Sequence, residues 1–322
     1  MQFFKDNKIY DLMSKKKFFG VFSLVLVTLS IVLLFTKGLN FGIDFKGGTI
    51  VQVKYEAKAP IQNIRGILDN TEYKGSEVTR FGSESEIIIK IKQSTTAIGE
   101  DLGDKISKIL TPTGEYEIRR VDMVGPKVGN ELKEKGLTAL ILSLLVILAY
   151  VSYRFEYRFA VASILALVHD VLITVGVLIV FQVDINLDIL AAILTIIGYS
   201  LNDTIIVFDR VRESVENTKE SDLNKLLNNS ISKTLSRTTL TSLTTFFVVL
   251  TLFLFGGEII HGFALTMLVG VIVGTYSSIF VASPILDRFN FDISNYRLNK
   301  DKKEQARKAK ERERQMYENG RI

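Results

Sequence analysis

The residues with the clearest potential for chemistry are ionisable side chains inside long apolar stretches. Asp203 lies deep in one stretch, and His169 and Asp170 lie in another. A charged side chain near the centre of a bilayer costs about 2.5 to 3.5 kcal/mol on insertion, so such residues are usually kept for a function. A buried carboxyl can take up and release protons, and histidine titrates near neutral pH. These residues are candidates for ion coupling or a proton relay, and a purely structural hydrogen bond between helices is the alternative for each.

Adjacent residues on a helix point about 100° apart. His169 and Asp170 therefore cannot both face one partner. We expect one of them to meet the helix that carries Asp203, and the other to approach a loop or the cytoplasmic interface. Tyr199 and Asn202 fall on the same side of their helix as Asp203, so the carboxyl extends a polar stripe that can face other helices or water.

Arg237 comes just before another apolar stretch, whose first turns are rich in serine and threonine. Hydroxyls of this kind can hydrogen-bond between helices or line a path for water. Arg237 can then reach a carboxylate on a neighbouring helix as an ion-coupling residue. It can equally be a basic anchor at the membrane edge, and the sequence leaves the two roles open.

The elements that position these residues are six apolar stretches, each long enough to cross about 30 Å of hydrocarbon. They cover residues 18–36, 137–153, 159–181, 187–208, 239–256 and 262–286. In lipid such stretches must be helices, because their backbone groups find no water to bond. The first stretch has the charged flank of a signal peptide, but it is long for one and no small-x-small cleavage site follows, so we expect an uncleaved span.

The distribution of lysine and arginine predicts that both termini lie in the cytoplasm. Basic residues occur in residues 1–17, in the turn after the second span, in residues 209–238 and in the tail, residues 287–322; the short loops 182–186 and 256–261 have none. The segment 37–136 is therefore extracytoplasmic, and long translocated domains are exempt from this charge rule. In the tail, a solvated helix or disordered segment and a surface for anionic lipid or ribosomal RNA both remain open.

The extracytoplasmic segment carries its own pattern. Alternating apolar residues predict strands near residues 51–55, 76–81, 86–92 and 115–121, and helical spacing predicts helices after Pro60 and around Ile106. The order βαββαβ is that of a ferredoxin-like α+β domain. We expect a polytopic α-helical membrane protein of six spans with this domain inserted between the first two, and such a fold says nothing about chemistry by itself.

Composition excludes several other classes. The chain of 322 residues has no cysteine, so disulfides and thiolate chemistry are absent, and its net charge of +5 follows the loops of a membrane protein, so we expect no nucleic acid partner. No constellation of nucleophile, base and oxyanion donors or of metal ligands points to an enzyme. In the last span Gly270 and Gly274 begin a series of small residues in four-residue steps, which favours close helix packing.

Six motifs follow one another along nearly the whole chain. They are Phe41-Gly42-Ile43-Asp44-Phe45-Lys46-Gly47-Gly48, Val124-Gly125-Pro126, Ala166-Leu167-Val168-His169-Asp170, Gly198-Tyr199-Ser200-Leu201-Asn202-Asp203-Thr204, Ser236-Arg237-Thr238 and Gly274-Thr275-Tyr276-Ser277-Ser278-Ile279-Phe280. In this order they resemble the SecD/SecF family of protein-export membrane proteins. Ile43-Asp44-Phe45, in place of Leu-Asp-Leu, and the modest outer domain resemble SecF more than SecD.

The resemblance implies one six-span half of a resistance-nodulation-division transporter in the bacterial cytoplasmic membrane. Its partner would be SecD, with the SecYEG channel, the unfolded preprotein and membrane lipids as further partners and SecA, YajC and YidC as candidates. The pair would use a proton or sodium gradient, without another cofactor, to drive late steps of protein translocation. Asp203 and Arg237 align with the family's charged residues implicated in ion coupling.

Two other functions stay open. A small-molecule or lipid exporter of the same superfamily usually contains both halves and large outer domains, whereas this chain has one half and one small domain. A purely structural scaffold would tolerate neutral residues at Asp203 and Arg237. The sequence does not distinguish H⁺ from Na⁺ as the coupling ion.

Overall fold

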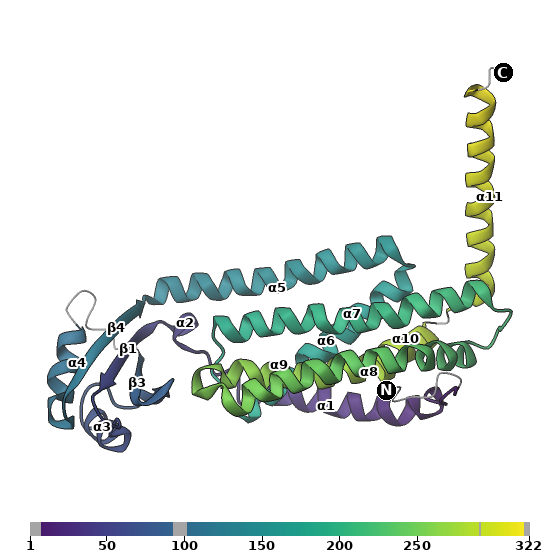
Figure 1. Ribbon diagram of the computed structural model, residues 1–322. Helices are drawn as coiled ribbons and strands as arrows, with labels where there is room; N and C mark the ends of the chain where they lie inside the picture. Colours follow the sequence, from purple (N-terminus) through teal and green to yellow (C-terminus); the bar gives the residue numbers. More distant parts are fainter. Residues whose placement is uncertain (1–7, 93–101, 290, 319–322) are drawn as a thin grey trace.

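The computed structural model describes residues 8–92, 102–289 and 291–318. Four pieces of the chain lie outside the described residues. They are residues 1–7 of the predicted N-terminal segment, residues 93–101 of the predicted outer domain, and residues 290 and 319–322 of the predicted basic tail. A bundle of long helices carries a small α/β domain at one end, and a further helix projects at the other (Figure 1). The two parts have separate hydrophobic cores.

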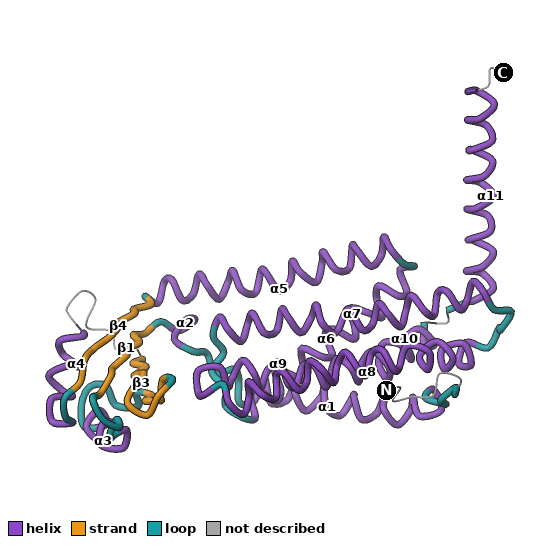
Figure 2. Tube along the Cα trace, viewed as in Figure 1, coloured by secondary structure: helices purple, strands orange, loops and turns teal. Residues whose placement is uncertain are grey.

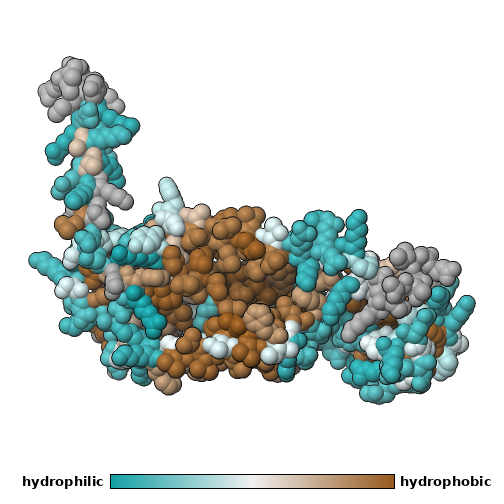
Figure 3. Space-filling model, turned by 180° about the vertical axis from the view of Figure 1, so that it is seen from behind, coloured by the Kyte–Doolittle hydropathy of each residue, from teal (hydrophilic) through white to brown (hydrophobic). Residues whose placement is uncertain are grey.

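Six helices in the described part of the chain are long and apolar enough to cross a membrane. They are α1 (Lys16–Thr36), α5 (Pro126–Arg154), α6 (Tyr157–Val180), α7 (Leu187–Asn217), α8 (Leu223–Phe255) and α9 (Gly257–Ser277), the last continuing through η3 (Ser278–Ala282) into α10 (Ser283–Arg288). On the face shown in Figure 3, apolar side chains form a broad band over the bundle between hydrophilic ends. This band is the surface that lipid requires.

Several helices extend well beyond the apolar stretches. The segment 209–238, expected to connect two spans, is helical except for residues 218–222, because α7 runs on to Asn217 and α8 starts at Leu223. The extensions pack on each other through buried Val211 and Val215 of α7 and Leu227 of α8. A search for continuous apolar stretches detects only the part of a helix that meets lipid. It misses a helical extension that buries one face and exposes polar residues on the other.

Two features mark the C-terminal end. The π-helical turn η3 comes just before Pro284, whose ring cannot donate a backbone hydrogen bond, so an irregular turn accommodates it. Beyond α10, α11 (Ile293–Glu318) projects at a steep angle to the bundle (Figure 1). Most of the described part of the basic tail is thus helical.

The inserted domain contains a four-stranded antiparallel sheet (Figure 2). In chain order its elements are β1 (Gly48–Tyr55), α3 (Ile61–Asp69), β2 (Glu77–Phe81), β3 (Ser83–Lys92), α4 (Leu102–Leu110), the short η2 (Thr111–Thr113) and β4 (Tyr116–Val124). Two further short helices come earlier in the chain: η1 (Met13–Lys15) precedes α1, and α2 (Ile43–Lys46) precedes β1. The strands lie side by side in the order β2-β3-β1-β4. This is the ferredoxin-like arrangement, and the predicted fold class is confirmed.

The core of this domain forms where one face of the sheet meets both helices. Val53 of β1 and Ile89 of β3 are fully buried, together with Ile64 of α3 and Ile106 of α4. Along β1 the burial alternates with the pleat of the strand. The alternation read from the sequence is the pattern that buries this face.

Candidate functional site

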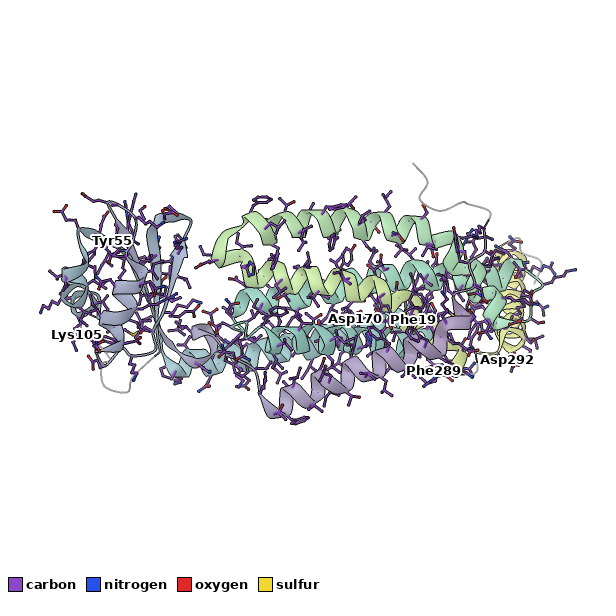
Figure 4. The ribbon with its side chains drawn as sticks, turned by 90° about the horizontal axis from the view of Figure 1, so that it is seen from below. Phe19, Tyr55, Lys105, Asp170, Phe289 and Asp292 are labelled. Carbon is purple, nitrogen blue, oxygen red and sulfur yellow. The ribbon has the colours of Figure 1, made fainter. Side chains whose placement is uncertain are left out.

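Asp170 is the most extensively bonded buried carboxylate in the described part of the bundle. It lies on α6, is 1% exposed, and is placed in the middle of the bundle (Figure 4). Its Oδ2 accepts hydrogen bonds from Ser200 Oγ of α7 at 2.5 Å and from Ser277 Oγ of α9 at 2.7 Å. One carboxylate therefore joins three helices, and polar partners of this kind offset the cost of burying it.

His169 approaches a different part of the bundle. Its Nδ1 is 2.8 Å from Asp170 Oδ1, and its ring stacks on Tyr276 with centroids 6.2 Å apart. The Tyr276 hydroxyl hydrogen-bonds Ser23 of α1 at 2.7 Å. The side chain of His169 is 7% exposed, and its Nε2 has no hydrogen-bond partner among the described residues. Asp170 meets α7, as expected, but His169 does not approach a loop or the cytoplasmic interface, because it is buried in the bundle and stacked on Tyr276. The two side chains also share α9 as a partner, since Ser277 of that helix bonds Asp170.

Asp203 forms a second buried site, between α7 and α8. It is 1% exposed, and Ser242 Oγ donates a hydrogen bond to its Oδ2 at 3.1 Å. Within the described residues no Lys, Arg or His forms an ion pair with Asp203. The hydroxyls of Tyr199, Thr204 and Thr238, at most one helical turn from Asp203 or Ser242 in sequence, are buried without a partner in the described structure. Asp203 thus lies in a polar region with little direct compensation for a negative charge.

Arg237 and Asn202 lie outside this buried site. Both side chains are exposed. Arg237 lines a cavity of about 530 Å³ together with Arg154 and Asp209, and it forms no ion pair with a described residue. The structure therefore does not bring Arg237 to the carboxylate of Asp203, and Asn202 lies on the side of α7 that this chain leaves uncovered.

The helix α7 links the two carboxylates. Ser200, a ligand of Asp170, is three residues before Asp203, which is close to one helical turn. A change in the hydrogen bonding of either carboxylate therefore acts on the same helix. Ser200 and Ser277 belong to motifs noted in the sequence and Ser242 to the hydroxyl-rich start of its span, but the sequence did not identify them as partners of the two carboxylates, because serine is common in packed spans. Only their recurrence at buried positions identifies them.

The glycine-rich segment before β1 joins the inserted domain to the bundle. Gly42 N donates to Ile185 O at 2.8 Å, and Leu187 N donates to Asp44 Oδ2 at 3.0 Å. Asp44 thus accepts a hydrogen bond from a free N–H in the first turn of α7. The segment contacts the loop between α6 and α7, whose helices carry Asp170 and Asp203.

Gly47 and Gly48 are required by close approach of the backbone. A Cβ on Gly47 would lie 3.0 Å from Pro126 Cα, and one on Gly48 would lie 2.5 Å from Ile91 O. Both have positive φ, 80° and 152°. Gly125 in an extended conformation and Pro126 at the first turn begin α5. The two chain crossings between domain and bundle are therefore packed against each other.

The edge of the sheet also touches the bundle. Arg80 N of β2 donates to Glu258 at 2.9 Å, and Lys90 lies 3.3 Å from Glu77 and 3.6 Å from Asp184. Partial burial raises the pKa of Glu77, and the neighbouring Asp184 raises it further against the lowering effect of Lys90. Three charged groups therefore share one contact between domain and bundle.

The small residues of α9 allow α7 to approach it closely. A Cβ on Gly270 would lie 2.3 Å from the side chain of Ile196, and one on Gly274 would lie 3.0 Å from Ser200 Cβ. The approach at Gly274 positions Ser200 beside Ser277, where both reach Asp170. Packing by glycine is thus part of the construction of the carboxylate site.

Comparisons with known proteins cover the fold and the site. The family model described as protein export membrane protein SecD/SecF, C-terminal, matches residues 105–292, and the SecD/SecF GG motif matches residues 32–59. The protein translocase subunit SecF of Helicobacter pylori is 48% identical over 323 residues, 100% of both chains. SecF of Vibrio alginolyticus is 46% identical over 286 residues, 88% of this chain and 91% of its own.

A solved structure shares the architecture. The crystal structure of SecDF, a translocon-associated membrane protein from Thermus thermophilus, matches with a TM-score of 0.78 and 33% identity over 88% of this chain. A super-membrane-facing form of SecDF matches with a TM-score of 0.69 and 32% identity. This chain spans 39% of the length of the first of these SecDF chains.

Proposed function

The chain belongs to the SecD/SecF family of protein-export membrane proteins, and from that premise we propose that it couples an ion gradient to movement of its outer domain. It is a multi-pass membrane protein of the bacterial protein translocase, similar over its full length to subunits named SecF. The observation that carries the proposal is Asp203, a buried carboxylate with one hydroxyl donor and no ion pair among the described residues.

The energy available from a gradient is sufficient to shift a packing equilibrium. Moving one charge through a potential of 100 mV releases about 2.3 kcal/mol. That energy does work only if the two charge states of the site favour different arrangements of the helices. Neutralising Asp203 weakens the hydrogen bond from Ser242, because a neutral carboxyl is a poorer acceptor than a carboxylate, and this eases a shift of α7 against α8.

The path to the outer domain runs along α7. Leu187, whose N–H bonds Asp44, and Asp203 are 16 residues apart on this helix, about 24 Å at 1.5 Å per residue. A shift of α7 therefore displaces the Asp44 segment, which continues directly into β1. Gly42 and its bond to Ile185 transmit motion of the adjoining loop in the same way.

Asp170 supports the same motion from a second position. Its bonds to Ser200 and Ser277 hold α7 and α9 in one register. Proton movement between His169 and Asp170 would change how strongly those hydroxyls are held. We assign Arg237 and Asn202 to the face toward the partner half, where Arg237 would approach a carboxylate when the two halves are assembled.

The work proposed is mechanical, with no covalent step and no cofactor beyond the coupling ion, H⁺ or Na⁺. The partner half is SecD, and the assembly acts with the SecYEG channel on an unfolded preprotein, with SecA, YajC and YidC as further candidates. Both termini lie in the cytoplasm of a bacterium whose inner membrane holds the chain. The outer domain then faces the emerging polypeptide.

The proposal is tested with Asp203→Asn, reconstituted with the partner half and the channel in vesicles. Gradient-dependent translocation should fall to the level seen without a gradient, while ATP-driven translocation persists. Asp188→Asn, which changes an exposed carboxylate at the start of the same helix, is the matched control and should act like the unmodified chain. Imposing H⁺ and Na⁺ gradients separately identifies the ion, and undiminished gradient-dependent translocation by Asp203→Asn would overturn the proposal.

A further inference from the structure

A half-open groove runs along the outside of the bundle between α1 and the end of α9. It encloses about 640 Å³. Val21, Leu24 and Val27 of α1 line one wall, and Phe280, Val281 and Ile285 line the other. Val21 and Leu24 are 62% and 65% exposed, so this wall is open at the side. A long apolar trough open toward the lipid has the shape that an acyl chain fills.

One end of the groove carries an excess of positive charge. Lys16, Lys17 and Arg288 line it, with Asp287 as the acidic member. Lys16 Nζ pairs with Asp287 at 2.8 Å and also hydrogen-bonds Asn224. Lys17 and Arg288 have no ion pair with any described residue, so two cations remain uncompensated. By the charge distribution of the loops this is the cytoplasmic end, the level at which lipid phosphates lie.

A buried histidine with an unpaired ring nitrogen lines the groove. His169 lines the groove, is 7% exposed, and has an Nε2 without a hydrogen-bond partner in the described structure. Buried polar atoms are nearly always bonded, so one left unpaired at a groove wall indicates a ligand with a polar group at that depth. In a phospholipid the glycerol ester or hydroxyl oxygens lie just below the phosphate and supply such a group.

We propose that this groove binds one phospholipid with a negatively charged headgroup. The phosphate lies between Lys17 and Arg288, the glycerol oxygens reach His169, and one acyl chain lies along α1. Positive charge at the mouth favours an anionic headgroup over a zwitterionic one, because basic residues near the membrane surface attract the net negative charge of such a lipid. The bound lipid would sit against the His169–Asp170 pair and fix α1 on the bundle. This proposal depends on membrane insertion and not on ion coupling.

The test uses the full chain in nanodiscs of phosphatidylcholine with a minor fraction of phosphatidylglycerol. Native mass spectrometry after mild extraction should find one phosphatidylglycerol retained per chain. Lys17→Ala combined with Arg288→Ala should reduce its retention about tenfold or more, as expected from the loss of two charges. Lys219→Ala with Lys225→Ala removes two exposed lysines, one between α7 and α8 and one in the first turn of α8, and is the matched control, with retention unchanged.

A second variant tests the groove without changing its charge. Gly20 lines the groove, and a Cβ built on it meets nothing within 4 Å, so Gly20→Leu adds an apolar side chain to the trough without a clash at Cβ. It should abolish retention while the thermal midpoint stays at or above that of the unmodified chain. Equal retention in all variants would overturn the proposal. The proposal would also be overturned if the groove binds the partner half instead of a lipid. In that case Gly20→Leu would abolish co-purification of the partner half and leave lipid retention unchanged.

Discussion

Ser277 Oγ of α9 donates a 2.7 Å hydrogen bond to Asp170 Oδ2 of α6, across 107 residues of sequence. Ser200 Oγ donates to the same oxygen from α7. Because all three side chains are at most 1% exposed, no water replaces a lost partner. The bundle is therefore held at its centre by a network whose members depend on one another.

The first prediction concerns this network. Asp170→Ala removes the acceptor shared by Ser200 and Ser277 and should lower the free energy of unfolding by about 1 to 3 kcal/mol. The cost comes chiefly from Ser200, whose buried hydroxyl loses its partner, because Ser277 keeps a hydrogen bond to Gly274 O. Ser277→Ala leaves Asp170 with Ser200 and His169 and should cost less, about 1 kcal/mol. Thermal unfolding in detergent measures both.

The control for the network is Ser152→Ala, an exposed serine on α5. It should leave the midpoint unchanged. A midpoint that falls equally for Ser152→Ala and Asp170→Ala would show that detergent sensitivity, and not the network, governs the result.

The second prediction concerns the contact between α7 and α9. Gly270→Ala places a methyl group 2.3 Å from the side chain of Ile196, and such overpacking should destabilise the bundle by about 1 to 3 kcal/mol. Ile196→Ala creates the missing space, so Gly270→Ala should cost clearly less in that background. Gly198→Ala, where a Cβ meets nothing within 4 Å, is the matched helix glycine and should be neutral or slightly stabilising. Equal costs of Gly270→Ala in both backgrounds would contradict the contact.

The sequence predicted the inserted domain closely because its information is local. Alternation at Val51 and Val53 and helical spacing around Ile106 determine which face each element buries, and the antiparallel order follows from the connections. It did not reveal that α7 and α8 continue beyond the lipid. Polar residues on the outer sides of those extensions interrupt the apolar sequence, so a search for apolar stretches does not detect the buried face.

The candidate site was predictable only in part. Asp170 and Asp203 stand out because a carboxylate is costly in an apolar helix. Their partners Ser277 and Ser242 depend on which helix faces are brought together, which is decided by long-range packing at residues such as Gly274. The expected approach of Arg237 to a carboxylate stays a prediction, since Arg237 is exposed and lies apart from Asp203 in this single chain.

The third prediction is a pH dependence of the contact between domain and bundle. The pKa of Glu77 is raised above its ordinary value of 4.5, so the docked arrangement favours the neutral carboxyl. Its contribution to docking is fully present below pH 4.5 and is lost as the pH rises through the raised value. Docking should therefore weaken with rising pH in that window, and Glu77→Gln should keep it strong throughout.

The absence of cysteine makes this measurement direct. Cysteines introduced at exposed Gln62 of α3 and Ile259 of α9 are the only labelling sites, and spin labels there report the distance between domain and bundle. Glu86→Gln is the control. The Glu86 carboxylate on β3 accepts a hydrogen bond from Gln52 of the same domain, so this variant should preserve the pH profile. A distance distribution that does not respond to pH in the unmodified chain would rule out this titration.

The fourth prediction concerns the junction through which force must pass. Gly48→Ala puts a Cβ 2.5 Å from Ile91 O at a φ of 152°, so the first pair of the β1–β3 ladder must open or shift, at a cost of about 1 to 3 kcal/mol. Hydrogen exchange of the ladder amides should show the loss. Gly66→Ala, in α3 with open space around it, should leave exchange unchanged or slower.

The same variant separates force transmission from ion sensing. Gly48 is remote in sequence from Asp170 and Asp203, so Gly48→Ala should leave the exchange protection of α6 and α7 intact while gradient-dependent translocation falls. Asp203→Asn should also lower gradient-dependent translocation, but with the β1–β3 ladder fully protected. If Gly48→Ala opens the ladder and still translocates as well as Gly66→Ala does, the outer domain is not pulled through this segment. The link from Asp44 to α7 would then have to carry the motion to another surface.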